Sequence, residues 1–283
     1  MKQLEIIESI VDILKDVQGV KAIVLGGSWA YGAQRPDSDI DLGLYYQQAV
    51  PLDIGHIHKI ASKLNDFADP TVSALGEWGK WVNGGAWLII KGKRVDFLFR
   101  NIDFVAGILD DCNRGETQFD YYQQPAYGFH SYIYCAEIQL CKILYDPDGV
   151  IHSLKTKVVQ YPQALKSRII NSFVWNAQFT LENAKKPAMR GDVYFTAGCI
   201  TRIASGLVQA IYALNETYFI SDKRLGKDIE RFDIKPENFR ESIDNLLGHI
   251  GSDSEKLVET FLAADSLLRE VIALCGDQYK AKY

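Results

Sequence analysis

The sequence predicts an α+β protein: a mixed sheet with flanking helices in the first part and an all-helical second part. Short apolar runs and helical patterns alternate as far as Phe99, and only helical patterns follow. Charge divides in the same way, since residues 1–145 carry 18 acidic and 13 basic side chains, whereas residues 146–283 carry 18 of each. We therefore expect a first domain over residues 1–114 and a helical domain over residues 115–283.

The first elements follow from hydrophobic spacing. Apolar residues between Leu4 and Leu14 recur at helical intervals, and the aliphatic run Val20 to Leu25 predicts a buried strand that stops at a glycine turn. The next predicted elements are a short helix over 28–31, a strand over 39–45 and a helix over 54–67.

An antiparallel meander is predicted next. Asn83-Gly84-Gly85 is a tight-turn sequence between residues 81–82 and the run 86–90. A second turn at residues 91–93 leads into residues 94–99, where Asp96 points away from the face of its apolar neighbours. Beyond Phe99 we expect no strand, and the helical patterns cover residues 129–144, 162–185, 191–214, 237–248 and 253–275.

Composition excludes several classes of protein. The 283 residues carry a net charge of −5 and no basic run, which argues against a dedicated nucleic-acid binder. Five scattered cysteines indicate neither a disulfide framework nor a zinc module. The N-terminus lacks the pattern of a signal peptide, and the apolar stretch 203–214 is too short to span a bilayer. We expect a cytoplasmic protein with no nucleic-acid or membrane partner, and the oligomeric state stays open.

One constellation of residues indicates chemistry. The first strand ends in Gly26-Gly27-Ser28, and ten residues separate Ser28 from Asp39. Asp39 and Asp41 lie two apart on a strand, so both carboxylates point the same way. Two glycines allow close approach of a phosphate, and the following helix start offers free N–H groups. Neighbouring carboxylates repel each other unless a cation such as Mg²⁺ lies between them, and Asp96 could complete a two-metal site.

LGGS, ten residues, DIDL, and then the acid of RVDFLFR resemble the signature of the DNA polymerase beta-like nucleotidyltransferase superfamily. Within it, the stretch WVNGGAWLIIKGKRVDFLFR and the helical second half look closest to bacterial aminoglycoside and lincosamide nucleotidyltransferases and their relatives of unassigned acceptor. The resemblance covers about residues 20–100 and is weaker beyond.

The resemblance implies a role for each site residue. Gly27 and Ser28 would hold the triphosphate of a nucleotide, with Ser38 and Lys223 as further phosphate contacts.

By the same resemblance, Asp39 and Asp41 would ligate Mg²⁺, and two ions are expected in all. Asp96 would either ligate metal or take the proton of the acceptor hydroxyl. All three acids are thus candidate catalytic residues.

The predicted activity moves a nucleoside monophosphate, AMP by default, from a nucleoside triphosphate to a hydroxyl and releases pyrophosphate. The acceptor would be a small molecule such as an aminoglycoside- or lincosamide-like antibiotic, bound by the helical domain. Two alternatives stay open, a protein AMP-transferase and a nucleotide-binding regulator without turnover.

Two weaker candidates remain. Glu137 could act as the base for the acceptor, although a plain surface or interdomain acid is the more common role of such a residue. Trp78, Trp81 and Trp87 could form an aromatic wall for a flat substrate, although core packing is the commoner role of such rings.

Overall fold

A computed structural model of the protein describes residues 2–32, 34–35 and 37–281, and the chain divides into two compact units. Unit 1 consists of Met1–Asp111 together with Gln118–Gln160, and unit 2 of Cys112–Thr117 together with Tyr161–Tyr283. Unit 1 holds a mixed sheet with flanking helices and unit 2 is helical, so the predicted fold class is confirmed.

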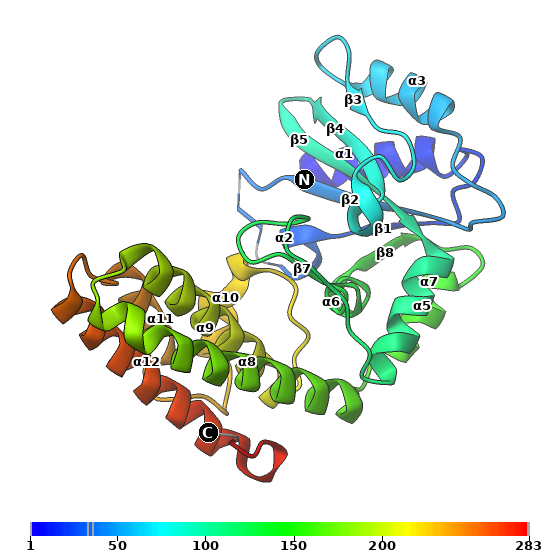
Figure 1. The fold of residues 1–283 in the computed structure, drawn as a ribbon. Helices are drawn as coiled ribbons and strands as arrows, with labels where there is room; N and C mark the ends of the chain where they lie inside the picture. The colour runs from blue at the N-terminus through cyan, green and yellow to red at the C-terminus, as the bar shows by residue number, and fades with distance from the viewer. Residues whose placement is uncertain (1, 33, 36, 282–283) are drawn as a thin grey trace. The chain divides into compact units, whose positions relative to one another are not determined.

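The sheet of unit 1 has six strands (Figure 1). In spatial order they are β3 (Thr71–Val72), β4 (Gly84–Ile90), β5 (Lys93–Asn101), β2 (Ile40–Tyr46), β1 (Ala22–Leu25) and β8 (Lys142–Tyr145). The central pair, β2 and β5, is parallel, and the other neighbours are antiparallel. The sheet is therefore mixed, as the sequence predicts.

One face of the sheet is covered by α1 (Lys2–Leu14) and α3 (Ile54–Leu64). Alternate residues of the strands point into this core, among them Ile40, Leu42, Val95 and Phe97, none of which is exposed. Because side chains alternate along a strand, Asp41 and Asp96 must lie on the opposite face.

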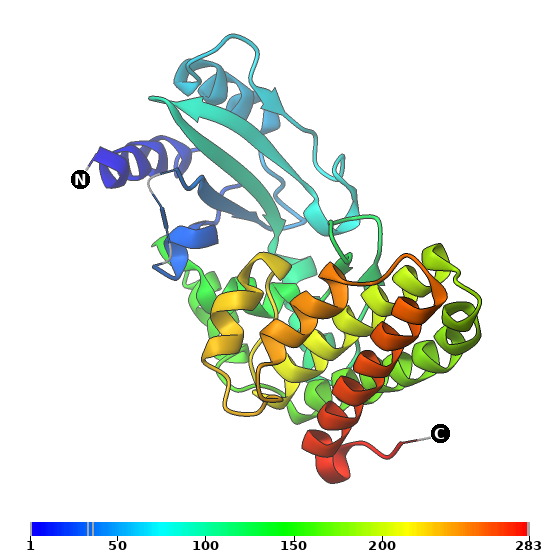
Figure 2. The ribbon, with the colours of Figure 1, turned by 90° about the vertical axis from the view of Figure 1, so that its left-hand side faces the viewer.

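The other helices of unit 1 are α2 (Gly27–Ala30), α4 (Gly79–Val82), α5 (Ile102–Asn113), which continues into unit 2, α6 (Ile133–Leu140) and α7 (Val150–Lys157). A two-stranded sheet, β6 (Phe119–Asp120) and β7 (Phe129–His130), completes the unit. Figure 2 shows β4 and β5 as a long twisted hairpin. Its two-residue turn has positive φ at Lys91 and Gly92, which is the type I′ geometry that suits the twist of the strands.

Three predictions for unit 1 are wrong. Trp81 and Val82 form the one-turn helix α4 and no strand, because the amide of Asn83 donates to the carbonyl of Gly79. Positive φ at Asn83 (68°) then ends the helix, so the turn sequence is a helix terminus. The predicted helix over 129–144 is reduced to α6, because the strands β7 and β8 occupy the two ends of that range. Contrary to prediction, therefore, strands do follow Phe99.

The predicted domain boundary after residue 114 also differs from the observed division. Residues 118–160 belong to unit 1, because β8 pairs with β1 and extends the sheet. The four residues of β8 are half-buried or exposed and lack a clear alternation, so their pattern gave no strand signal.

Unit 2 consists of long helices that pack on one another. They are α8 (Gln163–Met189), α9 (Val193–Leu214), α10 (Leu225–Glu230), α11 (Phe239–Gly248) and α12 (Ser254–Cys275), with short 3₁₀ turns η1 (Asp222–Arg224) and η2 (Gly276–Gln278). The α8, α9 and α12 helices contact one another, and the four predicted helices of this region are confirmed within a few residues (Figure 1).

The helix α9 extends well beyond the apolar stretch 203–214 that the sequence analysis considered as a membrane span. Its 22 residues are long and apolar enough to cross a membrane by length and composition, but 72% of the most apolar window is buried within the protein. Burial of that kind is typical of the core helix of a folded domain. The five cysteines are free and buried, so they form no disulfide framework.

Candidate functional site

The predicted acids meet in one row across the sheet of unit 1. Asp41 of β2 pairs directly with Asp96 of the parallel strand β5. On the far side of Asp41, the amide of Gly26 donates to the Asp41 carbonyl at 2.8 Å. Because directly paired residues share a face, the two carboxylates stand side by side next to the glycine turn. The predicted juxtaposition of Asp41, Asp96 and the glycine turn is therefore present.

The glycine turn closes against the carboxylate of Asp41. A Cβ built on Gly27 would lie 1.8 Å from Asp41 Oδ2, and Gly27 has φ of +53°, which side chains disfavour. Only glycine allows both features at this position. The sequence thus keeps a narrow backbone cradle beside Asp41.

Asp39 lies two residues before Asp41 and contacts the same end of β5. Its Oδ1 lies 3.9 Å from Nε of Arg94, an exposed and loosely formed ion pair. Burial, followed by the negative charge of Asp39, raises the pKa of Asp96, and Arg94 offsets part of that shift. Asp39 and Asp96 therefore interact electrostatically, and Asp41 stands beside Asp96 on the sheet.

At its other end, which we call the closed end, the same face of the sheet is buried. There, Arg100 of β5 donates from Nε to Glu137 Oε1 at 2.7 Å and from Nη2 to Oε2 at 3.1 Å, and the hydroxyl of Tyr45 donates to Oε1 at 3.2 Å. Tyr45 and Arg100 are buried. Burial lowers and the Glu137 carboxylate raises the pKa of Arg100, and the net shift is upward. Glu137 therefore holds a structural ion pair within unit 1.

The carboxylates could supply only some of the ligands of a metal ion. Among the residues that the structure describes, no group of three or more His, Cys, Asp and Glu side chains is arranged to hold a metal ion. Mg²⁺ usually takes one or two protein carboxylates, and substrate phosphates and water supply its other ligands. The oxygen donors of Asp39, Asp41 and Asp96, next to the Gly27 cradle, fit that mode of binding.

Two of the predicted phosphate contacts, Ser28 and Ser38, lie in α2 and in the loop before β2. Ser28 is half-buried in α2, which is one turn long, so backbone N–H groups matter more here than a helix dipole. The Ser38 hydroxyl accepts from the amide of Arg35 at 2.8 Å and holds the loop that leads into β2. Ser38 therefore has a structural role whether or not it contacts phosphate.

Lysines occur near the turn and in unit 2. Lys142 of β8 donates from Nζ to the carbonyl of Trp29 at 3.0 Å. Trp29 follows Gly27 by two residues, so the ammonium group lies against the helix that begins at the glycine turn. The sequence analysis missed Lys142 because it predicted no strand there. Lys223 is exposed in η1 of unit 2, and its contact with a triphosphate stays a prediction.

The three tryptophans separate into two environments. Trp81 is 3% exposed and packs between Phe104 and Phe129, with ring centroids 5.8 and 5.3 Å away. Trp78 and Trp87 instead stack on each other at 4.7 Å, and Trp87 is 55% exposed. Core packing thus holds for Trp81 and not for Trp87.

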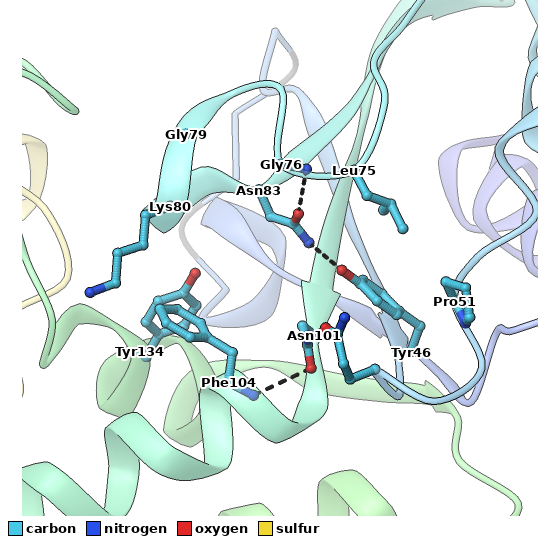
Figure 3. A pocket seen from close by; sticks show the side chains of 11 residues that line it. Tyr46, Pro51, Leu75, Gly76, Gly79, Lys80, Asn83, Asn101, Phe104 and Tyr134 are labelled. Atoms are coloured by element: carbon cyan, nitrogen blue, oxygen red, sulfur yellow. Dashed lines mark hydrogen bonds between the residues drawn. The ribbon is translucent and has the colours of Figure 1, made fainter.

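A pocket of about 350 Å³ lies near the closed end of β2 and β5 (Figure 3). Tyr46, in its wall, is five residues along β2 from Asp41, about 16 Å away in a strand. The polar groups that line the pocket bind one another. Asn83 Nδ2 donates to the Tyr46 hydroxyl at 3.0 Å, and Asn83 Oδ1 accepts from the Gly76 amide at 2.8 Å. The row of acids, and not this pocket, is therefore the candidate site.

Two family models match parts of the chain. Residues 8–73 match the family described as polymerase beta, nucleotidyltransferase, a range that contains the glycine turn, Asp39 and Asp41. Residues 133–224 match a domain of unknown function (DUF4037). Unit 1 thus contains a polymerase beta-like nucleotidyltransferase domain, and nucleotidyl transfer is the general activity that the match supports.

Among solved structures, the chain is similar to a nucleotidyltransferase-like protein from Exiguobacterium sibiricum 255-15. The identity is 10%, the alignment covers 97% of this chain and 76% of the other, and the TM-score is 0.46. No curated protein matches the chain. The resemblance to aminoglycoside and lincosamide nucleotidyltransferases stays a prediction.

Proposed function

We propose that the protein is a Mg²⁺-dependent nucleotidyltransferase that moves AMP from ATP to a hydroxyl of a small molecule. The observation that carries the proposal is the row formed by the glycine turn, Asp41 and Asp96 on an open face of the sheet. It combines a cradle for phosphate with carboxylates for a cation, which are the two requirements of phosphoryl-transfer chemistry.

In the proposed reaction, the acceptor oxygen attacks the α-phosphorus of the nucleotide. A new bond forms between that oxygen and the α-phosphorus, the bond from the α-phosphorus to the bridging oxygen of the β-phosphate breaks, and pyrophosphate leaves. The acceptor proton passes to Asp96 or to water. Burial raises the pKa of Asp96, which makes its carboxylate a stronger base than an ordinary aspartate.

Asp39 and Asp41 would hold one Mg²⁺ ion, and Asp96 a second ion if it is not the base. When bound, Mg²⁺ supplies positive charge against the α-phosphate and the leaving group. The protein itself mainly positions the reactants, as is general for phosphoryl transfer.

The triphosphate would lie along the Gly27 cradle, with the hydroxyls of Ser28 and Ser38 as donors. We propose Lys142 of unit 1 as a further cation for the triphosphate, beside the earlier candidate Lys223, because its Nζ already binds the carbonyl of Trp29 in α2. A triphosphate amid three acids requires such compensating charge.

A second candidate is a nucleotide-binding regulator without turnover. One observation favours it: no three-acid metal group exists in the described part of the chain. If Mg²⁺ and nucleotide do not draw the carboxylates together, the protein would bind nucleotide and release no pyrophosphate.

One experiment separates these functions. The purified chain is incubated with Mg²⁺, each of the four common nucleoside triphosphates and a mixed library of aminoglycosides, lincosamides and proteins, and products are identified by mass spectrometry. An added AMP mass on a small molecule supports the proposal, and the same mass on a protein would favour a protein AMP-transferase. Nucleotide binding without pyrophosphate release would favour the regulator, and no nucleotide binding would contradict both.

A further inference from the structure

The row of acids continues into an aromatic residue. Trp87 of β4 pairs directly with Asp96 across the antiparallel ladder, so the indole and the carboxylate share a face. Across the sheet, the order is the glycine turn, Asp41, Asp96 and Trp87. Under the proposed function the triphosphate occupies the glycine side, so the acceptor must approach from the side of Trp87.

Trp87 is held in place by a second ring. Trp78 stacks on it with an interplanar angle of 26°, and a Cβ on Gly85 would lie 2.8 Å from Cζ3 of the Trp78 ring. Gly85 thus lets the Trp78 ring lie on the backbone of β4. The carbonyl of Trp78 accepts from Gln123 Nε2 at 3.1 Å, and its amide donates to the Asn83 carbonyl at 3.1 Å.

The exposure of Trp87 is unusual for so large a ring. It is 55% exposed, whereas Ala86 and Leu88, its neighbours on β4, are buried on the other face. A single exposed apolar residue needs no explanation by itself. This ring, however, is supported by a second ring and stands beside a candidate catalytic acid, so its free surface is available to a reactant.

The spacing limits what the reactant can be. Directly paired residues have Cβ atoms about 5 Å apart, and their side chains stand roughly perpendicular to the sheet. The reacting hydroxyl at Asp96 and the surface that packs on Trp87 must therefore lie within about 5 Å of each other in the same molecule. A ring that carries the hydroxyl directly, such as a cyclic polyol or a phenol, satisfies this distance, whereas an open-chain alcohol has no flat face to offer.

We infer that Trp87, supported by Trp78, forms the acceptor wall of the site and selects molecules whose reacting hydroxyl is attached directly to a ring. This inference rests on the proposed function for the identity of the reacting group. Binding to the wall can nevertheless be measured without turnover.

The test compares matched probes by saturation-transfer difference NMR on the full chain with ATP and Mg²⁺. The ring probes are myo-inositol and tyrosine amide, and the open-chain probes are sorbitol and serine amide. We expect saturation of the ring probes only, a roughly 2- to 10-fold weaker signal in Trp87→Thr, and recovery in Trp87→Phe. Phe67→Ala, which removes a ring 66% exposed elsewhere in unit 1, should leave the signal unchanged.

The variant Asp41→Asn separates the two claims. It should keep the signal of the ring probes while pyrophosphate release is lost. Loss of transfer can therefore be distinguished from loss of binding to the acceptor wall. Equal signals from ring and open-chain probes, no signal from any ring probe, or a signal that does not change in Trp87→Thr would each overturn the inference. If only tyrosine amide responds, the acceptor ring is aromatic; if only myo-inositol responds, it is saturated, and both results support the wall.

Discussion

The two ends of one sheet face in unit 1 carry acids in opposite circumstances. At the closed end, Glu137 receives two hydrogen bonds from the buried guanidinium of Arg100. At the open end, Asp39 and Asp96 lie near the exposed Arg94, whose nearest approach to Asp39 is 3.9 Å, and Asp41 pairs with Asp96. The comparison teaches that the same two strands use charge for folding where water is excluded and keep acidic charge available for a ligand where water has access.

The largest effect is expected from Asp41→Asn at the open end. The substitution keeps the shape and removes the charge, so transfer should fall by at least about 1,000-fold while the fold persists. Pyrophosphate release and the circular dichroism spectrum measure the two properties. Asp37→Asn, which removes an exposed acid from the loop before β2, is the control and should retain activity. Activity near that of the wild type in Asp41→Asn would contradict the mechanism.

At the closed end, Arg100→Met should lower the free energy of unfolding by about 3–5 kcal/mol, because Glu137 is left without its buried partner. Urea unfolding followed by probes in unit 1 measures the change. The double variant Arg100→Met with Glu137→Met removes both charges and should recover most of the loss. If the single and double variants were equally unstable, packing and not charge would explain the effect.

A third test uses pH. Burial lowers the pKa of His130 to about 4. The histidine of the unfolded chain is therefore protonated near pH 6.5, whereas that of the folded chain is protonated only near pH 4. Stability is therefore unaffected above pH 6.5 and falls as the pH drops from 6.5 to about 4, by up to about 3 kcal/mol. His130→Phe, which keeps the stacking on Phe119 and Tyr132, should flatten this slope in urea unfolding. The exposed His56→Gln is the control, and an unchanged slope in His130→Phe would refute the assignment.

The smallest effect is expected from Arg94→Gln, the open-end counterpart of Arg100→Met on the same face of β5. Its ion pair with Asp39 is exposed, so the free energy of unfolding should change by less than about 1 kcal/mol. Parallel urea unfolding of the two arginine variants measures the contrast directly. Equal losses in the two variants would remove the distinction between the ends of the face.

The sequence predicted much of the site because its signals are local. Gly27 and the spacing to Asp39 and Asp41 are visible within twenty residues, and Asp96 stands out among apolar neighbours. Hydrophobic periodicity shows which face a side chain occupies, but it does not show which strands are neighbours. The parallel pairing that brings Asp41 beside Asp96, and the ladder that adds Trp87, needed the structure.

The errors have the same origin. Residues 81–82 resemble a strand before a turn, and the contacts of Trp81 with distant rings decide otherwise. The strand β8 is too short to have a periodicity, and its place at the sheet edge depends on pairing with β1, more than a hundred residues earlier.

That returning strand affects how unit 1 can be prepared alone. A fragment ending at residue 114 would lack β8. The apolar strand β1 would then become an edge strand with unpaired backbone donors and acceptors. Such a fragment should self-associate through that edge strand, whereas one that extends through Gln160 keeps β1 paired with β8.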